Sequence, residues 1–459
     1  MQTINKNWNQ RGVGTMGKFR NLVLGTTALV GLAATGTSAF AEGFEIREQS
    51  AWGQGASYAG VAAGGSVSSM FWNPATMTQT GAFALETSGS MIFPQASQTG
   101  TTNLAPLFTD GTPNSGQDAF VLASYATYRL TDRIWAGVSI NSPFGLETAF
   151  ENPNWAGAFY GQSSTLRTYT ATPSLAIKIF DWLSVGGGFQ AEYGLTDLKF
   201  ATGFSPMLPP FPPTGPQIQL AQAMGHGWGF GWTAGVTVTP TSSTQVGLGY
   251  RSGIDQHIGG NLDTGAAVGF GTPGTVNTTI KLPGIASLGV RQGLTPQFTL
   301  LGTVEWTNWS RIGTSTLTQG NGAPALAPSG AVVQVPFQWR DSWFYSLGLE
   351  YAVAPAWTLR GGVAYESNAI PDQVRTPLVP DDSRMWYSVG ATNTVGPFKI
   401  DLAYSFIDVK TAPINIVPGN PSFNGLVTYT GSSRGNVSIF SIGVKYMMAP
   451  PPPAVSTRG

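Results

Sequence analysis

The stretch Asp341-Ser-Trp-Phe-Tyr-Ser-Leu-Gly-Leu-Glu-Tyr351 decides the fold of this chain. Its large apolar side chains recur at every second position, at Trp343, Tyr345, Leu347, Leu349 and Tyr351. Most of the positions between them are small or polar. Because successive side chains of a β-strand point to opposite faces, the pattern predicts a strand with one apolar face and one polar face.

The same two-residue period recurs at 167–179, 298–306 and 398–406. A soluble β-sandwich would alternate too, but its polar faces would carry more charge. Here only 10% of the 459 residues are charged, against about 25% in an ordinary soluble domain. The aromatic content of 12% argues against disorder, and the absence of cysteine excludes a disulfide scaffold. The composition therefore favours strands that face lipid on one side.

The one long apolar run lies near the N-terminus. Lys18 and Arg20 precede an apolar segment at 21–34, which an Ala39-Phe-Ala41 motif follows. This pattern is typical of a secretory signal peptide, so we expect residues 1–41 to be removed after Ala41. The alternative is a membrane-anchoring helix, but the run is shorter than the ~20 apolar residues of a span. An exported, lipid-facing chain without spanning helices implies a closed barrel, which satisfies all backbone groups in hydrocarbon.

Fourteen alternating segments follow residue 80, and the connections between them alternate in length. We expect an all-β, fourteen-stranded antiparallel transmembrane β-barrel over residues 81–447, followed by a proline-rich tail at 448–459. Outer-membrane barrels place short turns in the periplasm and long loops outside. The long loops are expected at 94–118, 143–166, 194–227, 254–277, 310–339, 367–383 and 410–434. The six short turns are expected at 130–133, 180–182, 240–243, 293–296, 352–356 and 395–397.

Residues 42–80 do not alternate as a strand does. The segment is rich in glycine and small polar residues, yet it carries Phe44, Trp52, Tyr58, Phe71 and Trp72. These large side chains need burial, and the barrel lumen is the place available, so we interpret the segment as a plug. A disordered leader is the alternative. A turn is expected where the plug meets the wall, at Asn73, Pro74 and Ala75.

Ordered fragments along the mature chain resemble the FadL-type family of outer-membrane transporters for long-chain fatty acids and other hydrophobic compounds. They include Asn73-Pro-Ala75, Ser142-Pro-Phe-Gly-Leu-Glu-Thr148, Gly249-Tyr-Arg-Ser252 and Ile370-Pro-Asp372. The resemblance implies a fourteen-stranded barrel with an N-terminal hatch in the lumen. It also implies an inward kink in the third strand that opens a lateral gap, and the matching residues here are Pro143, Phe144 and Gly145. Proline removes a ladder donor and glycine permits a bend, so a pairing defect is expected there on physical grounds as well.

Candidate ligand-binding residues fall into two groups. The loop 194–227 contains an apolar, proline-rich run that an exposed connection does not need, so Met207, Leu208 and Phe211 are candidates for ligand capture. A guanidinium or ammonium group could hold a carboxylate head group. The cations expected at the extracellular strand ends are Arg167, Lys199, Arg251, Arg340 and Arg384.

Other charged side chains on the polar faces are expected to pair across the lumen, since a desolvated charge is costly without a partner. The expected carboxylates are Glu192, Glu305, Glu350 and Asp401, and their expected partners are Lys178, Arg251 and Arg360. The two histidines, His226 and His257, are expected in extracellular loops or at their edges. We therefore predict no enzyme activity, no cofactor and no metal site.

The function predicted from the sequence is passive uptake of long-chain fatty acids or similar hydrophobic molecules across the outer membrane of a Gram-negative bacterium. The alternatives are an aromatic-hydrocarbon channel on the same scaffold, a non-specific porin, and a purely structural barrel. The expected partners are the hydrophobic ligand and outer-membrane lipid. We expect a monomer that binds no nucleic acid, since the net charge is zero.

Overall fold

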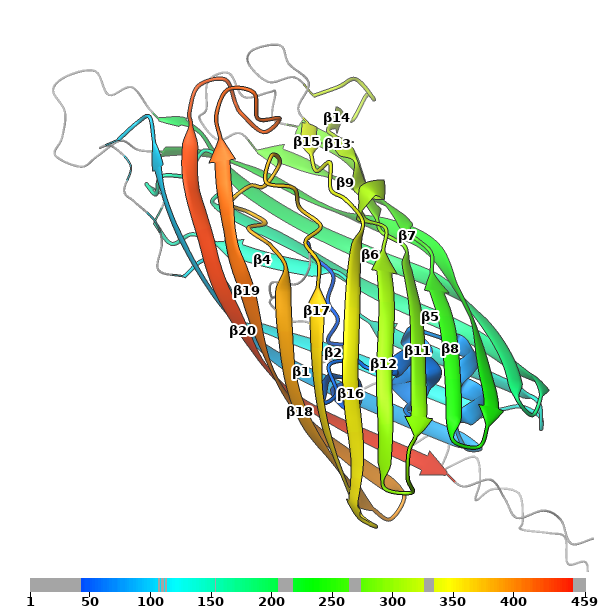
Figure 1. Cartoon of the computed structure of the whole chain (residues 1–459). Coiled ribbons are helices and arrows are strands. Elements are labelled where there is room, and N and C mark those ends of the chain that lie inside the picture. Colours follow the sequence, from blue (N-terminus) through cyan, green and yellow to red (C-terminus); the bar gives the residue numbers. More distant parts are fainter. Residues whose placement is uncertain are drawn as a thin grey trace, which may run out of the picture. The chain divides into compact units, whose positions relative to one another are not determined.

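The computed structural model describes residues 43–448 except 106–107, 109–110, 112–113, 153, 205–217, 264–273 and 326–333. Antiparallel strands form a closed barrel that tilts strongly across the view in Figure 1. The first half of the wall contains β1 (Phe83–Thr102), β2 (Ala119–Arg129), β3 (Ile134–Asn141), β4 (Gly145–Ala149), β5 (Ser163–Phe180), β6 (Leu183–Phe204) and β7 (Ile218–Thr241).

The second half continues in the same antiparallel order. It contains β8 (Thr244–Arg251), β9 (Ile254–Asp263), β10 (Gly274–Leu282), β11 (Ile285–Gly293), β12 (Phe298–Thr307), β14 (Thr318–Gln319), β16 (Ser342–Ala354), β17 (Trp357–Glu366), β18 (Arg384–Val395), β19 (Phe398–Ile416) and β20 (Tyr429–Met448). Two short strands, β13 (Thr314–Thr316) and β15 (Gln334–Pro336), pair with each other outside the barrel sheet.

Four wall strands are each divided into two pieces. Both β3 and β4 pair with β5, and both β8 and β9 pair with β7. Likewise β11 pairs with β8 while β10 pairs with β9, and β14 continues β12 by pairing with β10. Counting each divided strand once gives fourteen, and β1 pairs with β20 over twenty residues to close the ring. The predicted fourteen-stranded barrel is confirmed.

The wall places apolar side chains outside and polar ones inside, as the alternation predicted. On β16, Leu347 is 57% exposed on the outer face, whereas Ser346 is 8% exposed on the inner face. Phe344 departs from the pattern, because it is a large ring on the inner face and is 1% exposed. Its burial is explained by what fills the lumen, since the guanidinium of Arg47 lies 3.9 Å from the centre of its ring.

The six short turns lie where the sequence predicted them, but several predicted long loops are wrong in extent. β1, β6, β7, β9 and β19 continue well into them, and β4 lies within 143–166. On β19 the outward-facing pattern reverses along the strand: Leu402 is exposed near the short turns, whereas Ile414 and Ile416 are buried and Asn415 is exposed near the long loops. Strand ends of this kind no longer show apolar-outward alternation, so the sequence pattern predicted their ends too early.

Residues 43–80 lie inside the ring of strands, where Figure 1 shows them as the short blue helices. They comprise α2 (Ala51–Gln54) and the 3-10 turns η2 (Val61–Ala63), η3 (Val67–Phe71) and η4 (Pro74–Gln79); another such turn, η5 (Trp309–Ile312), follows β12. Among the described residues, no helix is long and apolar enough to cross a membrane. We call residues 43–80 the inner segment.

Asn73 connects the inner segment to the wall. Its side-chain amide donates to the carbonyl oxygens of Ala62 (2.7 Å) and Val236 on β7 (2.9 Å), and its Oδ1 accepts from the Ala75 amide (3.0 Å). Gly235 on β7 makes this approach possible, because a Cβ there would lie 2.0 Å from Asn73 Oδ1. The boundaries 1–41, 42–80, 81–447 and 448–459 remain a prediction.

Candidate lateral opening and luminal site

The wall is interrupted within its third strand. β3 pairs with β2 from Trp135 to Ile140, and the chain then leaves that ladder. β4 resumes pairing with β5, but between β4 and the β2 side of the wall the described residues show only one isolated bridge, Gly116 to Thr148. The residues of the interruption include Pro143, Phe144 and Gly145, where Pro143 offers no N–H to a ladder.

The beginning of the inner segment occupies the interruption from inside. The Ile46 amide donates to the Pro143 carbonyl, and the Gly145 amide donates to the Phe44 carbonyl, each at 2.8 Å. Glu45 and Phe144 face each other in this short antiparallel bridge. Residues 44–46 therefore supply backbone partners that the neighbouring wall strand does not.

A cluster of buried apolar side chains surrounds this contact, and we call it the inner apolar cluster. The ring of Phe44 lies at its centre, 4.9 Å from that of Trp309 and 5.3 Å from that of Trp339, measured between centroids. Phe144 of the interruption belongs to it as well. The members are Phe44, Phe144, Leu146, Leu166, Ile254, Leu282, Ile285, Trp309, Ile312, Trp339, Ala369, Ile370 and Val374.

A second group, the outer apolar cluster, lies near the ends of the strands that carry the long loops. Its buried members are Phe108, Phe150, Trp155, Ala156, Ala158, Ile414, Ile416 and Tyr429. The connection 367–383 contacts both clusters, because Leu378 packs against the outer one and Ile370 belongs to the inner one. Arg375 fixes this connection by donating to the carbonyls of Ile370 and Pro413 from a fully buried position. The connection therefore links the two clusters.

Charged side chains hold the start of the inner segment. Arg47 is buried and pairs with Glu305, with Glu366 at 3.0 Å and with Glu45 at 3.3 Å. The Gly43 amide donates to Asp381 at 3.0 Å. Burial raises the pKa of Glu45 to about 8 and that of Glu48 to about 7, more than the nearby Arg47 lowers either of them. Burial also raises the pKa of Asp381.

The structure does not bring the five predicted cations together. Arg167 pairs with Glu147 at 2.8 Å, and Arg384 is buried against Asp381 and Glu366. The remaining three differ in exposure and contacts: Arg340 is exposed and donates to the Asn368 carbonyl (3.0 Å), Lys199 is half-buried, and Arg251 is buried beside Phe71. Met207, Leu208 and Phe211 lie outside the described residues.

The predicted ion pairs across the lumen are right in part. Arg360 pairs with Glu350 at 2.7 Å and with Asp401 at 3.7 Å, as two of the predicted partnerships have it. These pairs do not cross the lumen, because Glu350 faces Arg360 directly in the β16–β17 ladder and Asp401 lies on β19, two strands from β17. The prediction for Glu305 is wrong, since its partner is Arg47 of the inner segment. Glu192 forms no ion pair among the described residues, and it accepts a hydrogen bond from Thr170 at 2.7 Å instead.

Two further predictions about single residues are wrong. Lys178 does not pair with a carboxylate in the described part of the chain, and its ammonium lies 5.8 Å from the centre of the Trp135 ring. His226 and His257 lie in β7 and β9 rather than in loops, because both strands extend past their predicted ends.

Sequence reasoning also missed Arg47, although it is the one cation of the inner segment and stands between Glu45 and Glu48. The available signal was this group of three charged residues at 45–48, in a segment that carries no other charge up to residue 80.

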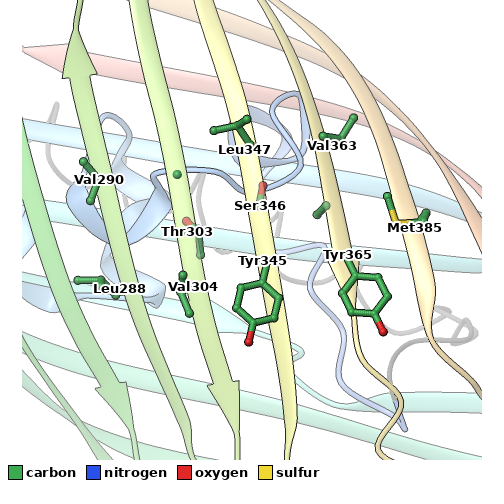
Figure 2. Close-up of a pocket in the computed structure, with 12 residues that line it drawn as sticks. Leu288, Val290, Thr303, Val304, Tyr345, Ser346, Leu347, Val363, Tyr365 and Met385 are labelled. Carbon is green, nitrogen blue, oxygen red and sulfur yellow. The ribbon is translucent and has the colours of Figure 1, made fainter.

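One surface hollow has no part in this site. Figure 2 shows it on the wall between β11 and β18, lined by outward-facing residues such as Leu288, Leu347 and Tyr365. These side chains are exposed on the outer face of the barrel. The hollow therefore belongs to the apolar exterior, and the candidate site remains the interruption with the inner apolar cluster behind it.

Comparison with known proteins places this geometry in context. The model of a family described as outer membrane protein transport protein (OMPP1/FadL/TodX) matches residues 32–448. A long-chain fatty acid transport protein of Escherichia coli O6:H1 is 26% identical over 450 residues, covering 91% of this chain and 97% of the relative. Outer membrane protein P1 of Haemophilus influenzae is 27% identical over 472 residues, covering 94% of this chain and 100% of the relative.

Solved structures show the same fold. A FadL homologue from Pseudomonas aeruginosa superposes with a TM-score of 0.77 at 22% identity, covering 88% of this chain and 99% of that one. The toluene transporter TbuX of Ralstonia pickettii superposes with a TM-score of 0.61 at 19% identity, covering 89% and 99%.

Proposed function

The chain belongs to the outer membrane protein transport protein family (OMPP1/FadL/TodX), and from this premise we propose that it takes up long-chain fatty acids or similar hydrophobic molecules. One observation carries the proposal: the inner apolar cluster contains both Phe44 of the inner segment and Phe144 of the wall interruption. An apolar solute in that cluster lies beside the one place in the third strand where backbone pairing is supplied from within the lumen.

Under this proposal the route has three stages. The long loops, with Met207, Leu208 and Phe211 among them, capture the molecule, and the cations Arg167, Lys199, Arg340 and Arg384 are candidates to attract its head group there. The molecule then replaces Phe44 in the inner apolar cluster. Withdrawal of residues 44–46 frees the interruption at Pro143–Gly145, and the molecule leaves sideways into the membrane. An apolar chain avoids water along this whole path, so no energy input is needed.

A second ligand class is favoured by one feature of the site. In the inner apolar cluster the rings of Phe144, Trp309 and Trp339 lie around Phe44. An aromatic hydrocarbon would fit such surroundings without any head-group partner. Both candidates use the same route, so they differ in ligand and not in mechanism.

Uptake by cells that lack their own transporter tests the proposal. Cells that express this chain should accumulate radiolabelled oleic acid faster than cells with the empty vector, and toluene uptake in the same cells separates the two ligand classes. A porin would instead admit small polar sugars at a rate set by their size. Sugar uptake without any gain for oleic acid or toluene would refute the proposal.

We further propose that residues 1–41 are removed on export and that the mature protein is a monomer with a proline-rich tail at 448–459. N-terminal sequencing of outer-membrane protein should then begin at Glu42. Recovery of the uncleaved chain from the outer membrane would contradict the first part, and a cross-linked dimer at native abundance would contradict the second.

A further inference from the structure

Two hollows on the outside of the barrel lie along the same pair of wall strands. The eighth wall strand consists of β10 and β11, and the ninth contains β12 and β14. One hollow, of about 450 Å³, adjoins β11 and β12. The other, of about 420 Å³, adjoins β10 and the chain at 314–318. The two hollows differ in chemistry, and the difference follows the direction of the strands.

The first hollow lies on the lipid-facing part of the wall, and we call it the apolar hollow. Leu288, Val304 and Leu347 line it, as Figure 2 shows. Gly302 creates the space, because a Cβ at this position would meet nothing nearer than the Ser346 carbonyl oxygen at 3.9 Å. The outer face of such a barrel is in contact with hydrocarbon. The apolar hollow therefore suits an acyl chain.

Aromatic side chains separate the two hollows. Trp306 faces Trp343 across the β12–β16 ladder, near the end of β12 that leads to the long loops. In outer-membrane barrels, girdles of aromatic residues mark the boundary between hydrocarbon and head groups, and the long loops lie outside the cell. The second hollow lies beyond these rings on the long-loop side, at the level of the head groups of the outer leaflet.

The second hollow is lined by polar side chains, and we call it the polar hollow. It remains open because Gly259 has no side chain, and a Cβ there would lie 3.1 Å from Asn277 Oδ1. Hydroxyl and amide groups of this kind can both donate and accept hydrogen bonds, as sugar hydroxyl groups require. The side chains that line the polar hollow include His257, Asn277, Thr279, Lys281, Thr314 and Thr316.

Lys281 adds a positive charge to this surface. It is exposed and faces Asp255 across the β9–β10 ladder. Asp255 pairs with Arg311 at 3.1 Å, and Lys281 forms no ion pair within the part of the chain that the structure describes. An ammonium group donates strong hydrogen bonds to a phosphate. A cation beside hydroxyl and amide groups therefore suits a phosphate that is attached to a sugar.

The spacing of the two hollows matches the length of a lipid. Lys281 and Leu288 are seven residues apart on the eighth strand, so they are separated by at most about 25 Å. The strand is tilted, which makes the difference in height smaller. One leaflet, including its head groups, is about 20 Å thick, or half of the ~40–45 Å bilayer. A single lipid can thus reach both hollows.

We propose that the two hollows together bind one phosphorylated glycolipid of the outer leaflet, with an acyl chain in the apolar hollow and the phosphorylated sugar in the polar hollow. The outer leaflet of a Gram-negative outer membrane is built from glycolipids of this kind. A glycerophospholipid offers the phosphate but no sugar ring for the threonine hydroxyls. The site lies five strands around the ring from the third strand, so the bound lipid leaves the proposed exit free.

A lipid bound here also joins two parts of the wall that have few contacts of their own. The β10–β14 ladder contains two residue pairs. Two side-chain hydrogen bonds join the same parts of the chain, from Ser315 to the Thr279 carbonyl (3.2 Å) and from Thr278 to the Thr316 carbonyl (3.1 Å). A sugar that contacts Lys281 on one side and Thr316 on the other adds a further bridge. The bound glycolipid should therefore stabilise the folded barrel.

Native mass spectrometry of the purified mature barrel in a maltoside detergent tests the proposal, with diphosphoryl lipid A and phosphatidylglycerol as probes. The native barrel should retain one molecule of lipid A and bind phosphatidylglycerol more weakly. Lys281→Gln should weaken lipid A binding about 3- to 10-fold, because it removes a hydrogen bond to a charged group at an exposed site. Lys281→Arg should retain most of the affinity. Lys410→Gln, which changes an exposed lysine of β19 outside both hollows, is the matched control.

Two further variants test the hollows separately. Gly302→Phe fills the apolar hollow and should weaken lipid A binding. Gly361→Phe is its matched control, because a Cβ at this outward-facing position of β17 likewise meets only a carbonyl oxygen at 3.9 Å and the residue does not line the hollow. The double variant Thr314→Val, Thr316→Val keeps the shape of the polar hollow but removes two hydroxyl groups. It should weaken the binding of lipid A and leave that of phosphatidylglycerol unchanged.

A measurement on the native barrel does not depend on how the variants fold. The midpoint of thermal unfolding, followed by heat-modifiable migration on a gel, should rise when lipid A is added and rise less with phosphatidylglycerol. No retention of lipid A, or equal losses in Lys281→Gln and Lys410→Gln, would overturn the inference. Equal binding of both probes with the same dependence on Lys281 would show that the site recognises a phosphate alone, and it would overturn the assignment to a glycolipid. None of these results bears on uptake, since the proposed route does not pass through this face.

Discussion

In the described part of the chain the wall is interrupted in two regions, and these are closed in different ways. In the third strand, the bonds across Pro143 and Gly145 come from Phe44 and Ile46 of the inner segment, about a hundred residues earlier in the chain. The second region comprises the neighbouring seventh, eighth and ninth strands, which are divided at Ser252–Gly253, at Pro283–Gly284 and at 308–317. In this second region the backbone hydrogen bonds are supplied by other residues of the wall.

The second interruption is held by short connections. The Ser252 amide donates to the Trp232 carbonyl at 2.8 Å, and the Asn308 amide donates to the Gly284 carbonyl at 2.9 Å. Arg311 of η5 donates to the Leu282 carbonyl at 3.0 Å and pairs with Asp255 at 3.1 Å. Each of these partners belongs to a strand or turn that is itself paired in the wall.

From this comparison we infer that a pairing defect alone does not make a gate. Both interruptions contain a Pro–X–Gly or Pro–Gly sequence that disrupts a ladder. Only the first depends on a segment that can leave without breaking wall ladders. We therefore expect perturbations of the first interruption to change transport and those of the second to change stability slightly.

The largest effect is expected from locking the first interruption. Glu45 and Phe144 face each other in an antiparallel bridge, and such pairs have the Cα separation that a disulfide needs. The chain has no native cysteine, so Glu45→Cys with Phe144→Cys introduces the only possible disulfide. The oxidised protein should lose oleic acid uptake almost completely, and dithiothreitol should restore it to the level of the reduced double variant.

The matched control places the same bond at the second interruption. Asp255 and Lys281 face each other in the β9–β10 ladder, next to Gly253 and Pro283. Oxidation of Asp255→Cys with Lys281→Cys should leave uptake unchanged. The disulfide between positions 45 and 144 is verified on a non-reducing gel. Normal uptake by the oxidised Glu45→Cys, Phe144→Cys variant would show that the first interruption is not the exit.

The contrast between the two interruptions also shows which structural features could be predicted from the sequence and which could not. Lipid imposes strict alternation on the outer face, so the strand count and the short turns were predictable from Trp343 to Tyr351 and its counterparts. The third-strand kink was predictable from Pro143 and the family resemblance. The partners inside the lumen were not, because contacts such as Arg47 with Glu305 join residues 258 positions apart and follow no local period. Likewise, Glu192 faces Thr170 instead of a cation in the described structure because of the β5–β6 register, which its own neighbours in the sequence do not reveal.

A smaller but clear effect is expected from loosening the inner segment at its other end. Asn73→Ala removes the hydrogen bonds to the Ala62 and Val236 carbonyls, and each buried carbonyl left unpaired costs about 1–3 kcal/mol. The barrel should still fold, since its ladders do not involve this side chain. Single-channel conductance in planar bilayers should rise above that of the native protein, because the lumen is less tightly filled. Conductance at the native level, in protein whose migration on a gel remains heat-modifiable, would show that Asn73 does not hold the inner segment in place.

A pH effect of intermediate size is expected at the start of the inner segment. The pKa values of about 8 for Glu45 and about 7 for Glu48 in the docked state lie above the ordinary value of 4.5. An acid whose pKa is raised on docking stabilises the docked state fully below pH 4.5 and loses that contribution as pH rises through 7 and 8. Arg47, Glu305, Glu366 and Arg384 are the charged groups that face them.

Hydrogen exchange of residues 43–49, corrected for the intrinsic rate, measures this effect. Protection should fall between pH 6 and pH 9 in the native protein and should fall less in the double variant Glu45→Gln, Glu48→Gln. Residues 435–444 of β20 serve as an internal reference, because none of them is titratable and their strand is paired with both β1 and β19. Equal pH dependence in the native and double-variant proteins would show that Glu45 and Glu48 do not cause the loss of protection.

The smallest effect on stability and uptake is expected from a substitution of Arg311. A small effect is required if the second interruption is closed by the wall itself. Its ion pair with Asp255 has side chains that are 30% and 46% exposed, so the pair contributes about 0–1 kcal/mol. Arg311→Gln also removes the hydrogen bond to the Leu282 carbonyl, but Leu282 and Ile254 remain joined in the β9–β10 ladder, and Asn308 still bonds to Gly284. The midpoint of thermal unfolding, followed by loss of heat-modifiable migration, should therefore fall only slightly, while oleic acid uptake at matched surface expression stays at the native level. A large loss of uptake in the folded Arg311→Gln protein would mean that the second interruption also opens during transport. Closure by the inner segment would then no longer distinguish the interruption that opens from the one that stays closed.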